Sequence, residues 1–340
     1  MVALTDLLTR ARALRRVEPD GGGFDGFRAA DGARLRFASF AAGNSDGAGR
    51  GTVVFVPGRT EFIEKYFEDM HLFQAFGFSV AALDLRGQGL SHREDPDRDR
   101  HVIRDFTRHV SDLASFLADD GPLSDLPRPL ILVGHSAGSH VVLRTLHDHP
   151  GIAERAVTIA PMVAINGGPM PGALMRLMAG LMTGLGMGRS WLPGHGPYRE
   201  GVWGWRKQLT HDDGRFADED WFIANRDRRL AVGGVTWHWL KAALASCHVL
   251  AAPGYGEAIQ TPVLMVLAGQ DRIVSNAAAT ALAGRMPHAR RIMLDGAKHE
   301  ILRETDAIRL SLWRELVAFL DLDPTGARLS SAPDAAEPAP

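Results

Sequence analysis

Residues 130–138 read Leu-Ile-Leu-Val-Gly-His-Ser-Ala-Gly, an apolar run that leads into the pattern Gly-x-Ser-x-Gly. The run predicts a buried strand, and a helix is expected to begin near Ala137, so Ser136 lies in the turn between them. Glycines two positions before and two positions after the serine allow the strand and the helix to approach closely around a strained turn. This arrangement predicts a nucleophile elbow with an exposed Ser136 hydroxyl. A structural serine in a tight turn is the alternative.

Short apolar runs occur on both sides of this segment, and a helical pattern follows most of them. Such runs are typical of buried parallel strands with crossover helices. The predicted strands are 52–56, 79–83, 130–133, 156–159, 263–267 and 291–294, and the predicted helices are 61–76, 102–118, 137–149, 276–285 and 302–320. Residues 24–40 alternate between apolar and polar around Asp31-Gly32, which predicts an antiparallel hairpin at a sheet edge. The fold class is therefore α/β, with a mostly parallel central sheet flanked by helices.

The alternation of strands and helices breaks between about residues 161 and 250. This stretch carries six of the eleven methionines, followed by six of the seven tryptophans, and it predicts an inserted helical cap. Its methionines and tryptophans could form the cap's own small core, or they could line an apolar pocket. The predicted organisation is an N-terminal helical extension (1–23), a core (24–160 and 251–320), the cap (161–250) and a disordered tail (321–340).

A serine hydroxyl needs a base, and the base needs a group that fixes its tautomer. In this kind of elbow the chain order is serine, acid, histidine. Asp271 directly follows the predicted strand 263–267, and His299 lies in the loop after the predicted strand 291–294. We therefore expect Asp271 as the acid and His299 as the base, with Asp295 and Glu300 as competing acids near His299. His135 is expected to point away from the hydroxyl and to serve packing.

A tetrahedral intermediate also needs backbone N–H donors for its oxyanion. Ala137, the residue after the nucleophile, is expected to supply one of them. The loop after the predicted strand 52–56 reads Pro-Gly-Arg-Thr-Glu, and Arg59 is expected to supply the other. The Arg59 side chain could meet an anionic head group, although a salt bridge to a nearby acid is the simpler expectation. The segment 86–91 has glycines but no phosphate-loop lysine, so we interpret it as a structural turn.

Composition excludes several classes of protein. Lys and Arg number 38 against 40 Asp and Glu, which gives a net charge of −2 and does not favour nucleic acid as a partner. The single cysteine, Cys247, excludes an intrachain disulfide, and no zinc-site spacing is present. No metal or organic cofactor is expected. Cys247 itself lacks an elbow, so it is not expected to be a nucleophile.

The N-terminal residues predict an amphipathic helix, with arginines that follow the apolar residues instead of preceding them. A secretory signal has the opposite order, so a cytoplasmic location is expected. The helix could rest on an anionic membrane surface, or it could pack on its own domain.

Five motifs in order resemble the serine α/β-hydrolases of the monoacylglycerol lipase and bacterial lysophospholipase L2 group. They occupy residues 57–61, 84–91, 134–138, 269–271 and 296–300, and the similarity extends from about residue 24 to 320. The monoacylglycerol lipases usually have His-Gly in the oxyanion loop, whereas this chain has Pro57-Gly58, which is closer to the lysophospholipase branch.

The resemblance implies an α/β-hydrolase fold with Ser136 as nucleophile, Asp271 as orienting acid and His299 as general base and acid. It implies the backbone N–H groups of Arg59 and Ala137 as the oxyanion hole. It also implies carboxylic esters with one acyl chain as substrates, either lysophospholipids or monoacylglycerols. A general carboxylesterase, an acyltransferase with the same triad and a non-catalytic binding homologue are the alternatives.

Overall fold

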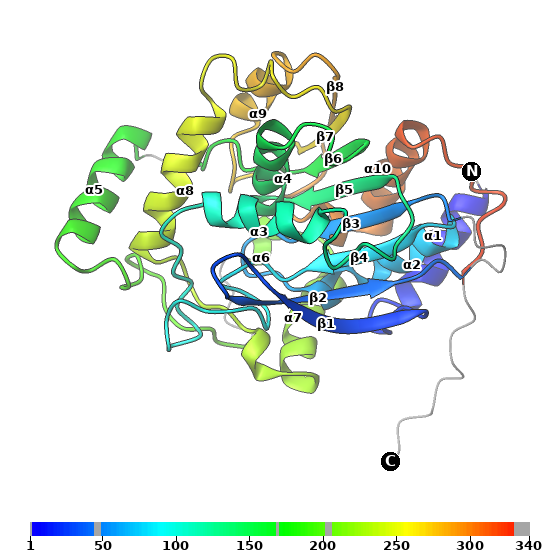
Figure 1. The fold of residues 1–340 in the computed structure, drawn as a ribbon, viewed down its shortest axis with the longest axis horizontal. Helices are drawn as coiled ribbons and strands as arrows, with labels where there is room; N and C mark the ends of the chain where they lie inside the picture. The colour runs from blue at the N-terminus through cyan, green and yellow to red at the C-terminus, as the bar shows by residue number, and fades with distance from the viewer. Residues whose placement is uncertain (1, 44–48, 168–169, 201–205, 330–340) are drawn as a thin grey trace.

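The computed structural model describes residues 2–43, 49–167, 170–200 and 206–329, and their centre is one eight-stranded sheet (Figure 1). The strand order is β1-β2-β4-β3-β5-β6-β7-β8. The strands are β1 (Gly22–Arg28), β2 (Arg34–Phe40), β3 (Thr52–Val56), β4 (Ser79–Leu83), β5 (Leu130–His135), β6 (Arg155–Ile159), β7 (Val263–Ala268) and β8 (Ala289–Leu294). From β4 to β8 every pairing is parallel, which confirms the predicted fold class.

The predicted N-terminal hairpin is β1 and β2, which pair antiparallel at one edge of the sheet. Gly32 in their turn has a φ of 81°, a conformation that glycine adopts without the steric cost of a Cβ. β2 also pairs antiparallel with β4, so the hairpin extends the parallel sheet.

Helices cover both faces of the sheet, because its central strands are apolar on both sides. One face packs against α1 (Val2–Ala13), α2 (Phe67–Ala75) and α10 (Asp306–Phe319). The other packs against α3 (Thr107–Leu117), α4 (Ala137–Asp148) and α9 (Asn276–Ala283). Short 3₁₀ turns, η1 (Ile63–Tyr66) and η3 (Ile301–Arg303), precede α2 and α10.

Three predicted helices differ at their starts. The helix predicted from residue 102 begins at Thr107, because the Asp105 carboxylate accepts a hydrogen bond from the Thr107 N–H and fixes a turn there. The helices predicted from residues 61 and 302 begin with the 3₁₀ turns. The spacing of apolar residues indicates which face of a helix is buried. It does not indicate the first residue of the helix, which depends on local hydrogen bonds.

The inserted segment between β6 and β7 contains α5 (Gly172–Gly184), α6 (Arg206–Leu209), α7 (Asp213–Asn225), η2 (Arg228–Leu230) and α8 (Trp237–Leu250). α5 and α8 pack together beyond one end of the sheet (Figure 1). Met175 and Trp237 belong to a small core between these two helices, as one of the two interpretations of the methionines and tryptophans predicts. Trp203 and Trp205 lie outside the described residues. No helix in the described ranges combines the length and apolar character needed to cross a bilayer.

The N-terminal helix α1 packs on its own domain. Its apolar residues at positions 4, 7, 8 and 11 are buried in the core shared with α2 and α10, so this face is not available to a membrane surface. Leu322 and Ala327 are also buried, and the Arg328 N–H donates to the Ala75 carbonyl. Residues 321–329, the start of the tail predicted as disordered, therefore pack on the core, because their apolar side chains are buried against it. The rest, 330–340, lies outside the described residues.

Candidate active site

Ser136 occupies the turn between β5 and α4, with φ of 51° and ψ of −114°. Two close approaches make the flanking glycines necessary. A Cβ on Gly138 would lie 2.0 Å from the Val56 carbonyl oxygen, and a Cβ on Gly134 would lie 2.7 Å from the Ser139 backbone. The strained serine is held by its own backbone, because its N–H donates to Ile159 and its carbonyl accepts from Met162.

The structure brings the three predicted side chains together. The Ser136 Oγ lies 2.9 Å from Nε2 of His299, and Nδ1 of His299 lies 2.7 Å from Oδ2 of Asp271. Asp271 comes from the end of β7, and His299 comes from the loop after β8. Ser136 is only 7% exposed and His299 only 4%, so the three groups interact away from bulk water.

The surroundings of Asp271 keep its carboxylate ionised. Burial raises its pKa, but the hydrogen bond from His299 and the backbone N–H groups of Ile273 and Val274 outweigh burial and lower it. An ionised acid accepts a hydrogen bond from the Nδ1–H of His299, which keeps the proton on Nδ1 and leaves Nε2 free to accept the Ser136 proton. The competing acid Glu300 instead lies within ion-pair distance of Lys65 and Arg303.

Of the predicted oxyanion donors, Arg59 lies on the loop after β3, and Ala137 is the first residue of α4, directly after Ser136. A Cβ on Gly58, which precedes Arg59, would lie 3.2 Å from the Ser136 Cβ. Within the described part of the chain, neither the Arg59 nor the Ala137 N–H donates a hydrogen bond to the protein. The loop that carries Arg59 is hydrogen-bonded to Gln88, whose Nε2 donates to the Gly58 and Glu61 carbonyls at 2.7 and 3.2 Å. The segment 86–91, interpreted as a structural turn, therefore supports this loop.

His135 and Glu61 form a buried pair that the sequence analysis missed. As expected, His135 points away from the hydroxyl, but its contacts are polar. Its Nδ1 lies 3.0 Å from Oε2 of Glu61, and its Nε2 lies 3.1 Å from the carbonyl oxygen of His299. The same Glu61 oxygen accepts from the Gly58 N–H and from the Tyr66 hydroxyl.

The charge of His135 follows from these partners. A carboxylate and a carbonyl can only accept, so both ring nitrogens must donate, and the ring is an imidazolium. Burial lowers the pKa of His135, but Glu61 overcomes this effect and raises it above the ordinary value. Burial likewise raises the pKa of Glu61, whereas the charges of His135 and Lys65 hold it well below its usual range. The position of His135 inside the elbow is the only signal in the sequence that could have indicated this role.

The loop that carries His299 is bonded to the cap. The Glu300 N–H donates to the Leu209 carbonyl at 2.8 Å, and the Lys298 ammonium donates to the Thr210 carbonyl at 3.1 Å. The buried Glu304 carboxylate accepts from Nδ1 of His211 at 2.8 Å and from the Lys298 N–H at 3.0 Å. The cap residues 209–211 and the His299 loop therefore form one hydrogen-bonded unit.

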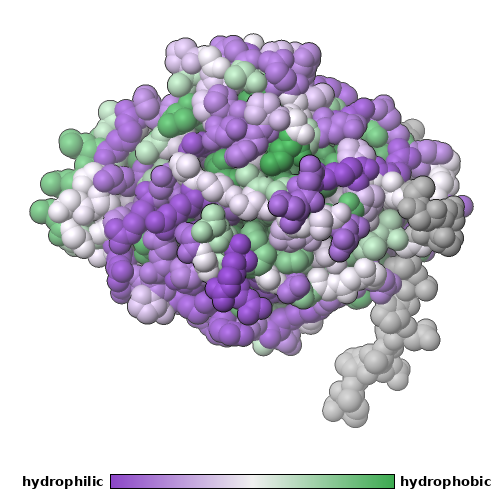
Figure 2. Space-filling model, viewed as in Figure 1, coloured by the Kyte–Doolittle hydropathy of each residue, from purple (hydrophilic) through white to green (hydrophobic). Residues whose placement is uncertain are grey.

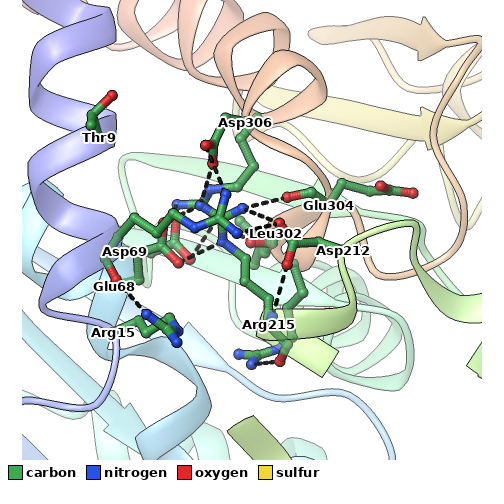
Figure 3. Close-up of polar contacts among 12 residues, drawn as sticks. Thr9, Arg15, Glu68, Asp69, Asp212, Arg215, Leu302, Glu304 and Asp306 are labelled. Atoms are coloured by element: carbon green, nitrogen blue, oxygen red, sulfur yellow. Dashed lines mark hydrogen bonds and ion pairs between the residues drawn. The ribbon is translucent and has the colours of Figure 1, made fainter. Parts of the chain in front are cut away.

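A buried ionic cluster extends this unit to the core (Figure 3). Arg215 of α7 pairs with Glu68 of α2 at 2.7 Å, with Asp306 of α10 at 2.6 Å and with Asp212 at 3.0 Å. Arg12 of α1 reaches the same two aspartates, Asp306 at 2.8 Å and Asp212 at 3.0 Å. The cluster thus joins the N-terminal helix, the cap and both core helices on this side.

Neither the single cysteine nor a metal-binding group adds a further reactive site among the described residues. Cys247 is buried in α8, and burial raises its pKa to about 12, which keeps the thiol protonated. Across the described ranges, no group of three or more His, Cys, Asp or Glu side chains is arranged to hold a metal ion.

Comparisons with known proteins show which family the chain resembles. The sequence profile of the family described as "Serine aminopeptidase, S33" matches residues 47–306. Lysophospholipase L2 of Escherichia coli (strain K12) is 31% identical over 316 residues, which cover 87% of this chain and 86% of that protein. A probable lysophospholipase L2 of Haemophilus influenzae (strain Rd) is 26% identical over 287 residues, which cover 82% and 86% of the two chains.

Among solved structures, a soluble variant of monoglyceride lipase from Saccharomyces cerevisiae superimposes with a TM-score of 0.68. The match has 18% identity and covers 90% of this chain and 95% of the other, so it bears on the fold alone. The profile match spans well over half of the chain and includes Ser136, Asp271 and His299. The chain therefore belongs to the serine aminopeptidase S33 family, a family of serine hydrolases with the α/β-hydrolase fold.

Proposed function

We propose that the protein is a serine carboxylester hydrolase that acts through an acyl-enzyme on lipid esters with one acyl chain, either lysophospholipids or monoacylglycerols. The observation that carries this proposal is the continuous relay of hydrogen bonds from Ser136 through His299 to Asp271. The names of the relatives support the substrate class, because the Escherichia coli protein that shares 31% identity is a lysophospholipase.

In the proposed reaction, the Ser136 hydroxyl attacks the ester carbonyl while Nε2 of His299 takes its proton. Asp271 holds the ring in the tautomer that can accept this proton and stabilises the imidazolium that forms. The Arg59 and Ala137 N–H groups donate to the oxyanion, and removal of one such donor costs about 3 kcal/mol in related chemistry. His299 then protonates the leaving alcohol. Water, deprotonated by His299, attacks the acyl-enzyme and releases the fatty acid.

The alternatives differ in what reaches the active site. An acyltransferase would use the same relay but would pass the acyl group to an alcohol instead of water. A general carboxylesterase would accept esters without a lipid chain. A non-catalytic homologue is disfavoured, because the three side chains lie within hydrogen-bond distance and His299 has an ionised partner.

We also propose that the protein works in the cytoplasm at a membrane surface, and that α5, not α1, makes the contact. α5 and the turn after it expose an apolar row formed by Leu174, Leu177, Leu181, Leu185 and Met187. Figure 2 shows apolar surface at the end of the molecule where Figure 1 places α5. A surface helix that leaves this face to solvent has the character of an interfacial helix, and a lipid substrate would be drawn from that same surface.

The proposal is tested by fatty-acid release from a lysophospholipid and from a monoacylglycerol of equal chain length, with Ser136→Ala as the blank. We expect release from one or both, and a loss of about a millionfold in the variant. Release from neither, while a short-chain activated ester is cleaved, would discard the lipid assignment and keep the triad. Free fatty acid replaced by a transacylated alcohol would identify an acyltransferase.

A further inference from the structure

The side chain of Arg59 lies between the oxyanion loop and the cap. Gly58, the preceding residue, lies beside Ser136. From there the Arg59 side chain reaches the cap, where its Nη2 donates to the Gly233 carbonyl at 2.6 Å. Its guanidinium carbon lies 5.4 Å from the centroid of the Trp239 ring at the start of α8. The guanidinium of Arg59 is thus held between the oxyanion loop and the cap by the Gly233 carbonyl and the Trp239 ring.

No carboxylate of the described residues lies within ion-pair distance of Arg59. Glu219 acts on the guanidinium from farther away, and it is itself bonded to Lys65 at 2.8 Å. The simpler expectation from the sequence, a salt bridge to a nearby acid, is therefore wrong for the described residues, and Glu219 pairs with Lys65 instead.

Arg59 also keeps unused donors. Its Nε is buried without a partner, and among the described residues its single hydrogen bond is the one to Gly233. Arg93 makes a useful contrast, because it too lacks a carboxylate and has a buried Nε without a partner, but its two Nη atoms donate to the carbonyls of four residues, Gly87, Gly89, Arg229 and Ala231. Buried guanidinium groups are normally paired, so the spare donors of Arg59 mark a place for an anion.

The neighbouring groups do not supply this anion. Burial lowers the pKa of Arg59 to about 10, so the group remains charged at neutral pH. Burial and the charge of Arg59 both hold the pKa of His101 well below its ordinary value, so that ring is neutral. Both ring nitrogens of His101 are buried without a partner as well. Among the described residues, the guanidinium therefore lies beside a neutral ring and has no carboxylate within ion-pair distance.

Building on the proposed function, we propose that Arg59 is a specificity-determining residue that binds the phosphodiester of a lysophospholipid head group. The ester carbonyl would lie at the backbone N–H of Arg59, and the phosphodiester is separated from that carbonyl by one glycerol unit. The side chain of the same residue can span such a separation. A guanidinium presents parallel donors that match phosphate oxygens, whereas a monoacylglycerol offers them no charge.

The test compares kcat/KM for oleoyl lysophosphatidylethanolamine and for monooleoylglycerol in the wild type, Arg59→Gln and Arg59→Lys. A change at the oxyanion backbone acts on both substrates and cancels in the ratio of the two values. We expect the ratio of lysophospholipid to monoacylglycerol to fall roughly 10- to 100-fold in Arg59→Gln, since a hydrogen bond to a charged group is lost. Arg59→Lys should retain part of the preference. Arg98→Gln, which removes an arginine that also lacks a carboxylate partner, is the matched control and should leave the ratio unchanged.

A second measurement needs no variant. Glycerophosphoethanolamine should inhibit wild-type cleavage of 4-nitrophenyl butyrate competitively, at concentrations where glycerol and inorganic phosphate do not. Equal inhibition by all three, or an unchanged ratio in Arg59→Gln, would overturn the role of Arg59 and leave the esterase assignment intact. Failure of the wild type to cleave either lipid would overturn the proposed function instead.

Discussion

Glu61 and His135 form a buried ion pair directly behind Ser136, with 3.0 Å between the carboxylate oxygen and Nδ1 of the ring. The pair connects two parts of the site that are distant in the chain. Glu61 accepts from the N–H of Gly58 in the oxyanion loop, and His135 donates to the carbonyl of His299. The positions of the oxyanion donor and of the base therefore depend on one another through His135.

The first prediction concerns the pH dependence of stability. The pKa of His135 is raised in the folded protein, so its stabilisation is fully present below the ordinary value of 6.5 and is lost as the pH rises through the raised value. The free energy of unfolding of the wild type should exceed that of His135→Asn by about 3 kcal/mol at pH 6, and the difference should shrink at higher pH. Urea unfolding between pH 6 and 9 measures it. His149→Asn, at an exposed position, should show no such trend. A difference that grows with pH would contradict a charged His135.

The second prediction concerns the choice of acid. Asp271→Asn should lower kcat by about ten-thousandfold, because an amide in that place favours the wrong tautomer of His299. Asp295→Asn is the matched control, since it changes the other aspartate at a strand end, and it should retain most of the activity. Steady-state rates on a short-chain activated ester suffice. The reverse pattern would show that Asp295 orients the base.

The third prediction concerns the glycines of the elbow. Gly138→Ala places a methyl group 2.0 Å from a backbone oxygen of β3, which cannot move aside as a flexible side chain would. We expect a loss of more than about 3 kcal/mol of stability or no soluble protein. Gly180→Ala in α5 meets nothing within 4 Å and should stabilise by about 0.5 to 1 kcal/mol. Thermal unfolding compares the two, and equal effects would refute the close approach.

The fourth prediction concerns the ionic cluster around Arg215. Arg215 is buried among the carboxylates of residues 68, 212 and 306. Arg215→Met would leave each of them with one arginine fewer, Arg309 remaining for Glu68 and Arg12 for the two aspartates, and should cost about 3 kcal/mol. Arg10→Met removes an exposed pair with Asp6 and should cost less than about 1 kcal/mol. Urea titrations of both variants test the contrast. Similar midpoints would mean that the cluster contributes little net stability.

The fifth prediction concerns the exposed row on α5. Leu177→Glu and Leu181→Glu should reduce co-sedimentation with vesicles of phosphatidylglycerol and phosphatidylcholine at least about tenfold, because burial of each leucine is lost and a negative charge is added. Cleavage of a water-soluble short-chain ester should not change. Val249→Glu alters an exposed apolar residue on α8, outside this row, and serves as control. Equal sedimentation of all variants would remove α5 from the contact.

The sequence predicted the parts of the fold that depend on local apolar runs. The limits of β3 and β4 agree with the predicted 52–56 and 79–83 at both ends, because both strands are apolar on both faces. The predicted site residues lie at strand ends, and parallel strands bring those ends to one edge of the sheet. Distant polar pairing was not predictable: Glu61 and His135 are 74 positions apart, and Glu68 and Arg215 are 147 apart. No periodicity encodes such partners, since each is chosen by the packing of separate elements.

The hydrogen bonds between residues 209–211 and the His299 loop limit how much of the cap can be exchanged between relatives as an independent unit. In a chimera that replaces the whole insertion 161–250 by that of a relative, the His299 loop would lose the carbonyls of Leu209 and Thr210 and the imidazole of His211. An exchange confined to α5 and its flanking turns would leave these bonds in place. Substrate preference can therefore diverge by replacement of the outer part of the cap, whereas the inner part must change together with the catalytic core.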